Sequence, residues 1–114
     1  MKQNNRQLGR KGEDMAAQAL INQGYQILSR NYQNRYGEID LIAQKGDCLY
    51  FVEVKLQRGN TFGAAAEQVT ATKKQRITQQ AEQYLAESDW QGACGFLIVT
   101  IDNDKLEIIE DFLV

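Results

Sequence analysis

The chain has 114 residues, of which 43% are hydrophobic and 25% charged, and its formal net charge is −2. A chain of this length buries roughly 60–70% of its unfolded surface, so we expect a single domain over residues 1–114. It contains no histidine, which excludes Ser-His-Asp and Cys-His nucleophiles, histidine zinc sites and zinc deaminases, so that any catalysis must use carboxylates, lysine or a hard metal ion.

The basic residues are concentrated early in the chain. Residues 1–76 hold 12 of the 13 Lys and Arg but 7 of the 15 Asp and Glu, a net charge of +5, and residues 77–114 have −7. Either a polyanion binds the first two thirds of the chain or the charges solubilise two faces. Composition leaves both interpretations open.

The sequence also predicts where the protein is found. No apolar stretch approaches membrane-spanning length, and no apolar region follows the basic N-terminus, so we expect a cytoplasmic protein without a signal peptide, an anchor or a membrane partner. Cys48 and Cys94 lie far apart in the sequence with no histidine or second pair nearby. Two reduced thiols are therefore predicted.

The first predicted element is a helix over residues 8–22, with Leu20 and Ile21 among the residues near its apolar face. Gly24 follows it and is expected to end the helix. Gly12 lowers helix propensity by roughly 1 kcal/mol relative to alanine. It either marks a weak first turn or permits close backbone approach.

Strands follow this helix. The β-branched and aromatic residues of 25–32 predict a first strand, and the polar residues 33–35 predict a turn. Residues 37–55 read as two strands joined by a tight turn. Residues 57–69 are expected to form a loop of the length at which loops are usually functional.

The second half of the chain predicts a helix and two more strands. A helix capped by Thr70 or Thr72 runs to about Ser88. The apolar run 96–101 predicts a strand buried on both faces, and residues 106–113 return as a last strand. The helix carries an apolar stripe formed by Ile77, Ala81, Tyr84 and Leu85. The order α-β-β-β-α-β-β predicts an α/β fold in which a mixed β-sheet is flanked by helices.

Three cations, Lys73, Lys74 and Arg76, crowd the first turn of the second helix. Cations in that position oppose the helix dipole by about 0.3–1 kcal/mol each, and a bound anion would relieve the mismatch. A solvated basic face is the alternative.

Acids and a lysine interrupt the apolar strands of residues 37–55, and their placement depends on register. If residues 46–47 form the loop, as glycine at the first position of a type II′ turn favours, paired residue numbers sum to 93. Asp40 then faces Glu53, and Glu38 faces Lys55. A three-residue loop would place the two acids on different faces.

Opposed carboxylates repel each other, so the structure is expected to raise one pKa or to hold a cation there. The ligand atoms of Asp40 and Glu53 are oxygens, which suits Mg²⁺ or Mn²⁺. Lys55 is placed to position a water or to stabilise negative charge. The alternative is an amphipathic hairpin whose polar face meets solvent, with Glu38 and Lys55 as a cross-strand pair.

The ordered motifs resemble the YraN-like family, a bacterial family grouped with the restriction-endonuclease-like PD-(D/E)xK nucleases. They are G-R-K-G-E at 9–13, N-Y at 31–32, G-E-I-D-L-I at 37–42, F-V-E-V-K at 51–55, F-G at 62–63 and K-K-Q-R-I from 73. The resemblance implies a restriction-endonuclease-like core of αβββαβ order.

The resemblance also implies a site. In it, Asp40 and Glu53 ligate a divalent ion with help from the carbonyl of Val54, and Lys55 assists attack by water. Glu13 matches an acid of the N-terminal helix that completes the metal shell, as in the similar archaeal Holliday-junction resolvases. A homodimer is suggested by that analogy alone.

Glu38 also matches a family position, where a salt bridge to Arg35 or Lys55 and contact with the metal are both open. The chain departs from the family directly after the lysine, where Leu56 and Gln57 replace the usual threonine and arginine. The departure leaves the metal acids intact and bears on substrate contacts beyond Lys55.

The expected activity is that of a metal-dependent endonuclease that hydrolyses DNA, with branched or damaged DNA in repair or recombination as the expected substrate. The alternatives are a catalytically silent nucleic-acid-binding or adaptor module with the same fold, and a protein-protein surface on the polar face of the hairpin. The residues expected to contact phosphates are Arg10, Lys11, Arg58, Lys73, Lys74 and Arg76.

Overall fold

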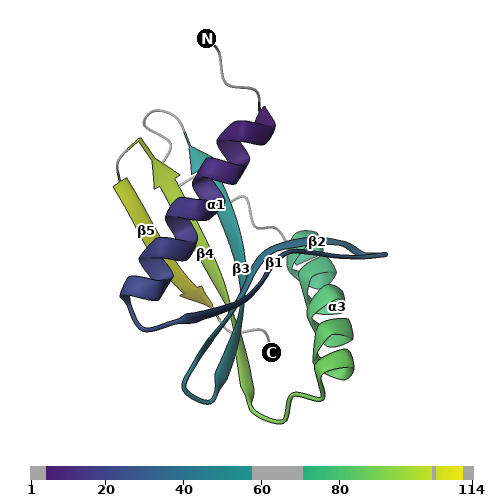
Figure 1. Ribbon diagram of the computed structural model, residues 1–114. Coiled ribbons are helices and arrows are strands. Elements are labelled where there is room, and N and C mark those ends of the chain that lie inside the picture. The colour runs from purple at the N-terminus through teal and green to yellow at the C-terminus, as the bar shows by residue number, and fades with distance from the viewer. Residues whose placement is uncertain (1–4, 58–70, 104, 112–114) are drawn as a thin grey trace.

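The computed structural model describes residues 5–57, 71–103 and 105–111 (Figure 1). The elements in chain order are α1 (Asn5–Asn22), β1 (Gln26–Asn34), β2 (Gly37–Lys45), β3 (Cys48–Gln57), α3 (Ala71–Ser88), β4 (Ala93–Asp102) and β5 (Lys105–Asp111). This order confirms the predicted α-β-β-β-α-β-β arrangement of the α/β fold. The observed strand boundaries differ from the predicted ones by up to three residues. The predicted loop at 57–69 lies outside the described residues, except for Gln57, which ends β3.

The strands form one five-stranded sheet in the order β1-β2-β3-β4-β5. Strands β3 and β4 are parallel, and the other neighbouring pairs are antiparallel. A parallel pair needs a crossover connection, and α3 lies in the segment between β3 and β4. The sheet is therefore mixed, with α1 on one face and α3 on the other (Figure 1).

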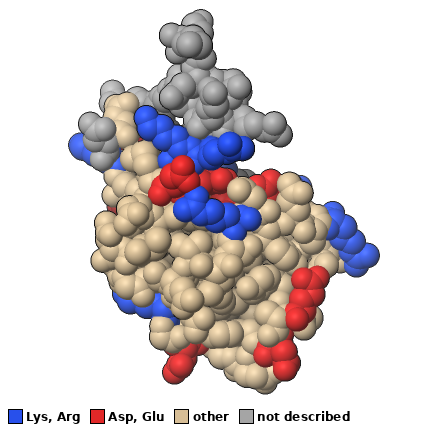
Figure 2. Space-filling model, in the orientation of Figure 1, with Lys and Arg blue, Asp and Glu red and all other residues tan. Residues whose placement is uncertain are grey.

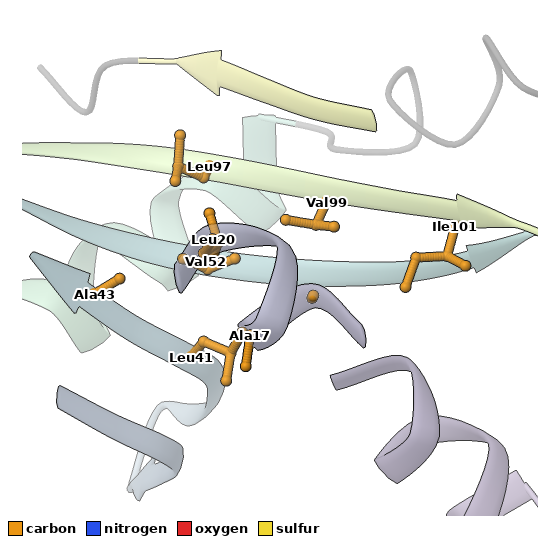
Figure 3. Packing of buried hydrophobic residues seen from close by; sticks show 9 residues of the cluster. Ala17, Leu20, Leu41, Ala43, Val52, Leu97, Val99 and Ile101 are labelled. Atoms are coloured by element: carbon orange, nitrogen blue, oxygen red, sulfur yellow. The ribbon is translucent and has the colours of Figure 1, made fainter. Parts of the chain in front are cut away.

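Two apolar clusters hold the helices against the sheet. On the α1 face, Ala17 and Leu20 point onto side chains of β2, β3 and β4 (Figure 3). On the α3 face, the predicted stripe of Ile77, Ala81, Tyr84 and Leu85 packs against the sheet. Strand β4 serves both faces, as predicted for a strand buried on both sides. Its residues Leu97, Val99 and Ile101 face α1, and Phe96 and Ile98 face α3.

Helix α1 ends as predicted. Gly24 has a φ of 95°, and the Tyr25 N–H donates to the Leu20 carbonyl at 3.0 Å, which closes the last turn. The apolar face differs from the prediction, because Ala17 is fully buried and Ile21 is 48% exposed. The contact stripe runs through Ala17 and Leu20, and Ile21 falls on its flank about 100° from Leu20.

The surroundings of Gly12 show which of its two predicted roles applies. It is buried, and a Cβ at this position would lie 2.8 Å from the Cδ2 atom of Leu56 on β3. Helix α1 therefore passes close to the Leu56 side chain at Gly12, which supports the predicted close approach over a weak first turn.

The hairpin of β2 and β3 has the predicted register. Pairs from Lys45 with Cys48 to Leu41 with Val52 all sum to 93. Gly46 has a φ of 59° and Asp47 a negative φ, as expected for a type II′ turn.

Pairing of β2 with β3 ends at Leu41 and Val52, one step before Asp40. The predicted pairs of Asp40 with Glu53 and of Glu38 with Lys55 are therefore not formed, because the ladder stops before it reaches them. Ile39 packs with the α3 cluster, whereas Leu41, two residues further on, packs with the α1 cluster. Residues two apart on a regular strand share a face, so β2 rotates between these positions. The strand leaves β3 where the candidate acids begin.

Within the described ranges, neither helix has both the length and the apolar character needed to cross a membrane.

Gly37→Ala is expected to destabilise the protein by about 1–3 kcal/mol. Gly37 has a φ of 134°, and an added Cβ would collide with the side-chain amide of Gln80. Urea unfolding measures the loss. Gly46→Asn is the matched control, because Gly46 has open space around it and Asn tolerates its φ of 59°. Equal stability of Gly37→Ala and the wild type would contradict the prediction.

Candidate metal centre and adjoining cavity

Helix α1 brings Glu13 to the sheet. Glu13, Ala16, Ala17 and Leu20 are spaced i, i+3, i+4 and i+7, so Glu13 continues the buried stripe of the helix by one turn. The carboxylate therefore faces β2 and is half-buried. The helical spacing alone, without the family resemblance, would also have placed Glu13 on the face that meets the sheet.

Three carboxylates meet at the point where β2 leaves β3. Oxygen atoms of Glu13, Glu38 and Asp40 all lie within 4.8 Å of one another. Glu38 and Asp40 share a side of β2, as their spacing of two residues predicts. Like charges this close repel, so this grouping suits a bound cation.

Asn31 on β1 joins two of these acids. With its amide nitrogen facing them, Asn31 donates to Glu38 Oε1 at 2.6 Å and to Glu13 Oε1 at 2.7 Å. Asn31 has a φ of 54°, a conformation that asparagine adopts more readily than most residues. The role of Asn31 was not predicted from the sequence, where its place in the N-Y motif was the available signal.

For Glu38 the sequence leaves a salt bridge and metal contact both open, and the structure places it among the acids. Besides the contact with Asn31, its Oε2 accepts a hydrogen bond from Gln33 Nε2 at 3.3 Å. The side-chain contacts found for Arg35 go to Tyr36, whose hydroxyl accepts from it at 2.7 Å. The observed partners of Glu38 therefore differ from the two basic residues considered for it.

The side chain of Asp40 replaces a backbone acceptor where the hydrogen-bonded pairing of β2 with β3 ends. Its Oδ2 accepts a hydrogen bond from the Val54 N–H at 2.8 Å. The N–H and C=O of one strand residue point to the same side of the strand, so the Val54 carbonyl also faces the β2 side of β3. Both backbone groups of Val54 therefore border the acid group.

Glu53 and Lys55 lie beside this group on β3. Lys55 Nζ is 3.0 Å from Glu53 Oε1, and both side chains are mostly buried. Glu53 stands outside the 4.8 Å group but lines a cavity together with Glu38 and Asp40. The predicted site residues are thus brought to one place, with Glu13, Glu38 and Asp40 closest together.

Electrostatics at this site act most strongly on Asp40. Burial raises the pKa of Asp40 from its ordinary value of 3.8 to about 6, and the neighbouring charges of Glu13, Glu53 and Glu38 add to the rise. The Val54 N–H opposes it. Burial, together with the charge of Glu38, also raises the pKa of Glu13, against the opposing bond from Asn31. Ionised acids at this site are therefore costly without a cation.

A cavity of about 180 Å³ adjoins the acids. It lies between the start of β2 and α3, and Glu38, Asp40 and Glu53 line one part of it. From α3 it is lined by Arg76, Ile77 and Gln80.

Gln80 is only 2% exposed, although it is a polar residue. Its Nε2 donates to the Tyr36 carbonyl at 2.9 Å, while its Oε1 has no hydrogen-bond partner among the described residues. Gln80 was not predicted as a site residue. Its position at i+3 from Ile77, inside the apolar stripe of α3, was the available signal.

The predicted phosphate contacts are placed in part. Arg10 and Lys11 are exposed on α1, three and two residues before Glu13, and Arg76 is exposed at the cavity. Arg58 lies outside the described residues, as do the side chains of Lys73 and Lys74. Figure 2 shows charged side chains of both signs gathered towards the end of the molecule where α1 begins. On this face the basic charge is therefore interleaved with acids.

The fold and the site define an α/β protein with a mixed sheet, in which three carboxylates lie together where β2 separates from β3. Over residues 12–102 the chain matches the uncharacterised protein family UPF0102 and belongs to it. The predicted YraN-like membership is thereby confirmed.

Relatives in this family cover most of the chain. A UPF0102 protein of Rhodococcus opacus (strain B4) is 52% identical over 81 residues, which are 71% of this chain and 69% of the relative. A UPF0102 protein of Chlorobium chlorochromatii (strain CaD3) is 45% identical over 96 residues, 84% of this chain and 74% of the relative. These names state no reaction.

Asp40→Asn is expected to stabilise the metal-free protein at neutral pH. Because the folded pKa of Asp40 is raised to about 6, stability is highest below the ordinary value of 3.8 and falls as pH rises through the window between the two values. Ionising Asp40 in the folded protein lowers the free energy of unfolding by up to about 3 kcal/mol at pH 7.5. The Asp40→Asn variant would avoid this loss, and its side-chain oxygen would still accept the hydrogen bond from the Val54 N–H.

Urea unfolding at pH 7.5 and pH 4, without divalent ions, measures this effect. The gain should appear at pH 7.5 and shrink at pH 4. Asp47→Asn, which changes an exposed carboxylate in the hairpin turn, should give no such gain. A variant of Asp40 no more stable than the wild type at pH 7.5 would contradict the raised pKa.

Proposed function

We propose that this protein is a nuclease that hydrolyses phosphodiester bonds in DNA with Mg²⁺ or Mn²⁺ as cofactor. The observation that carries the proposal is the group formed by Glu13, Glu38 and Asp40, whose oxygens lie within 4.8 Å of one another. Three carboxylates from two elements converge where one of them has a pKa raised to about 6. A divalent cation would offset both the repulsion and the cost of burial.

The donor set fits a hard cation. Carboxylate and carbonyl oxygens suit Mg²⁺ and Mn²⁺, whereas zinc sites usually include nitrogen or sulfur ligands. Asp40, Glu13 and Glu38 would hold the ion, and the Val54 carbonyl and Glu53, which border these acids, would be the next oxygen donors. When bound, the ion would supply charge stabilisation at the phosphate and lower the pKa of a bound water.

Lys55 supports a hydrolytic role beside these acids. Its ammonium is held 3.0 Å from Glu53 Oε1, so its charge is fixed in a partly buried site next to the cavity. A fixed cation in such a site stabilises negative charge that develops on a phosphate or orients an attacking water. The exposed Arg10, Lys11 and Arg76 would contact phosphates on either side.

Asp40→Asn and Lys55→Ala should each lower the rate of DNA cleavage by at least about 10²-fold, because each removes a group that acts on the reacting phosphate. Supercoiled DNA and a four-way junction, incubated with purified protein in Mg²⁺ or Mn²⁺, are the substrates. Asp47→Asn and Lys45→Ala alter exposed residues of the hairpin turn and should leave the rate unchanged. No cleavage by the wild type, or equal cleavage by the Asp40 and Lys55 variants, would overturn the proposal.

Calorimetric titration with Mn²⁺ should show one binding site in the wild type and at least tenfold weaker binding in Asp40→Asn and Glu13→Gln, since each loses a charged ligand. Lys55→Ala should retain the site, because the lysine ligates no metal. DNA binding that survives loss of Asp40, without any metal bound at millimolar concentration, would instead indicate a catalytically silent binding module.

A further inference from the structure

We propose that Asn31 is a positioning residue of the metal centre, whose amide holds Glu13 and Glu38 in the arrangement that receives the ion. The inference rests on the proposed function for the ion that the acids bind. It adds a residue of β1 that ligates no metal and nevertheless sets the affinity of the site.

Strand β1 changes face at Asn31. Arg30 forms an ion pair with Asp14 of α1, whereas Tyr32, two residues further on, packs with the α3 cluster. Residues two apart on a regular strand share a face. The alternation of burial along β1 also breaks here, because Arg30 and Asn31 are both exposed. The strand therefore rotates between Arg30 and Tyr32.

The rotation of β1 matches the rotation of β2. The register pairs on either side of Asn31 are Arg30 with Leu41 and Tyr32 with Ile39. Leu41 packs with the α1 cluster and Ile39 with the α3 cluster, so the two strands turn together. Asn31 lies between these pairs with a φ of 54°, in a region that asparagine enters more readily than most residues. This residue therefore makes the turn of β1 beside the acids.

The amide of the same residue bridges acids from two different elements. With its nitrogen facing them, it donates to Glu13 Oε1 on α1 at 2.7 Å and to Glu38 Oε1 on β2 at 2.6 Å. An asparagine amide carries two N–H donors, so one side chain can serve both carboxylates. Hydrogen bonds to ionised acceptors are stronger than neutral ones. The bridge therefore offsets part of the repulsion between the two acids before any ion binds.

Glu38 depends on this bridge more than Glu13 does. Its side chain is exposed, while that of Glu13 is half-buried. An exposed glutamate samples several rotamers, and holding it in one of them costs conformational entropy. The other bond to Glu38, from Gln33 Nε2 to Oε2, is longer at 3.3 Å. By holding Glu38 beside Glu13, Asn31 reduces the ordering that ion binding would otherwise require.

Asn31→Gly tests the role of the amide, because glycine adopts a φ of 54° readily and only the side chain is lost. Calorimetric titration should show Mn²⁺ binding about tenfold weaker than in the wild type, as expected when a residue that orients metal ligands is removed. Asn103→Gly is the matched control, since Asn103 is an exposed asparagine with a φ of 56° between β4 and β5. Its affinity for Mn²⁺ should equal that of the wild type.

A double-mutant cycle shows whether Asn31 acts through the acids. Glu13→Gln removes one of its two carboxylate partners, so adding Asn31→Gly to that protein should weaken Mn²⁺ binding by less than about threefold. In cleavage assays, Asn31→Gly should raise the Mn²⁺ concentration that gives half the maximal rate by about tenfold. The rate at saturating Mn²⁺ should stay within about twofold of the wild type. A residue that served the fold alone would lower stability in urea without this shift.

Equal Mn²⁺ affinity of Asn31→Gly and the wild type, or the same tenfold loss in the wild-type and Glu13→Gln backgrounds, would overturn the positioning role. If Asn31→Gly fails to fold, Asn31→Ser decides in its place, because a single O–H can donate to only one of the acids. Cleavage by the wild type, with unchanged Mn²⁺ affinity in the variant, would leave the nuclease standing and remove the positioning role. Weaker Mn²⁺ binding in the variant, without cleavage by the wild type, would do the reverse.

Discussion

The hydrogen bond from the Val54 N–H to Asp40 Oδ2 is the interaction on which the site depends. A regular β2–β3 ladder would continue past Leu41 and satisfy Val54 with backbone groups. The ladder instead ends at Leu41 and Val52, and a side chain takes the place of the backbone acceptor. Separation of the two strands therefore leaves the Val54 N–H with a hydrogen-bond acceptor. Strand β2 can diverge from β3 at this point and bring its acids to Glu13.

The rest of the molecule holds this opening in a fixed position. Glu13 lies on the same helical stripe as Ala17 and Leu20, which are fully buried against the sheet. On the other side, Ile39 is packed into the α3 cluster, so the departing part of β2 is anchored by a core of its own. Rigid elements on both faces therefore set the distances between the acids.

Two features of this site lower the stability of the folded protein in the absence of a bound cation or ligand. Desolvation and three neighbouring carboxylates raise the pKa of Asp40 to about 6, and the amide oxygen of the buried Gln80 is left without a partner among the described residues. Native proteins concentrate costs of this kind at functional sites. Asp40 and Gln80 line the same cavity, so both costs fall in one small region of the molecule.

The sequence by itself determined the element order, the hairpin register and the acids of β2 and β3. These follow from local rules, since strand alternation, turn chemistry and helix periodicity act over a few residues. The register that aligns Leu41 with Val52 needed only a glycine at the first turn position.

Only the tertiary structure decided how these acids group. The break of the ladder before Asp40, the contact of Asn31 with Glu13 and Glu38, and the burial of Gln80 arise between segments far apart in the chain. Local periodicity does not encode the rotation of β2 that follows when Ile39 packs against α3 and Leu41 against α1. Ile39 and Leu41 pack on opposite faces of the sheet because each belongs to a different apolar cluster. The resulting rotation of β2 places Glu38 and Asp40 beside Glu13.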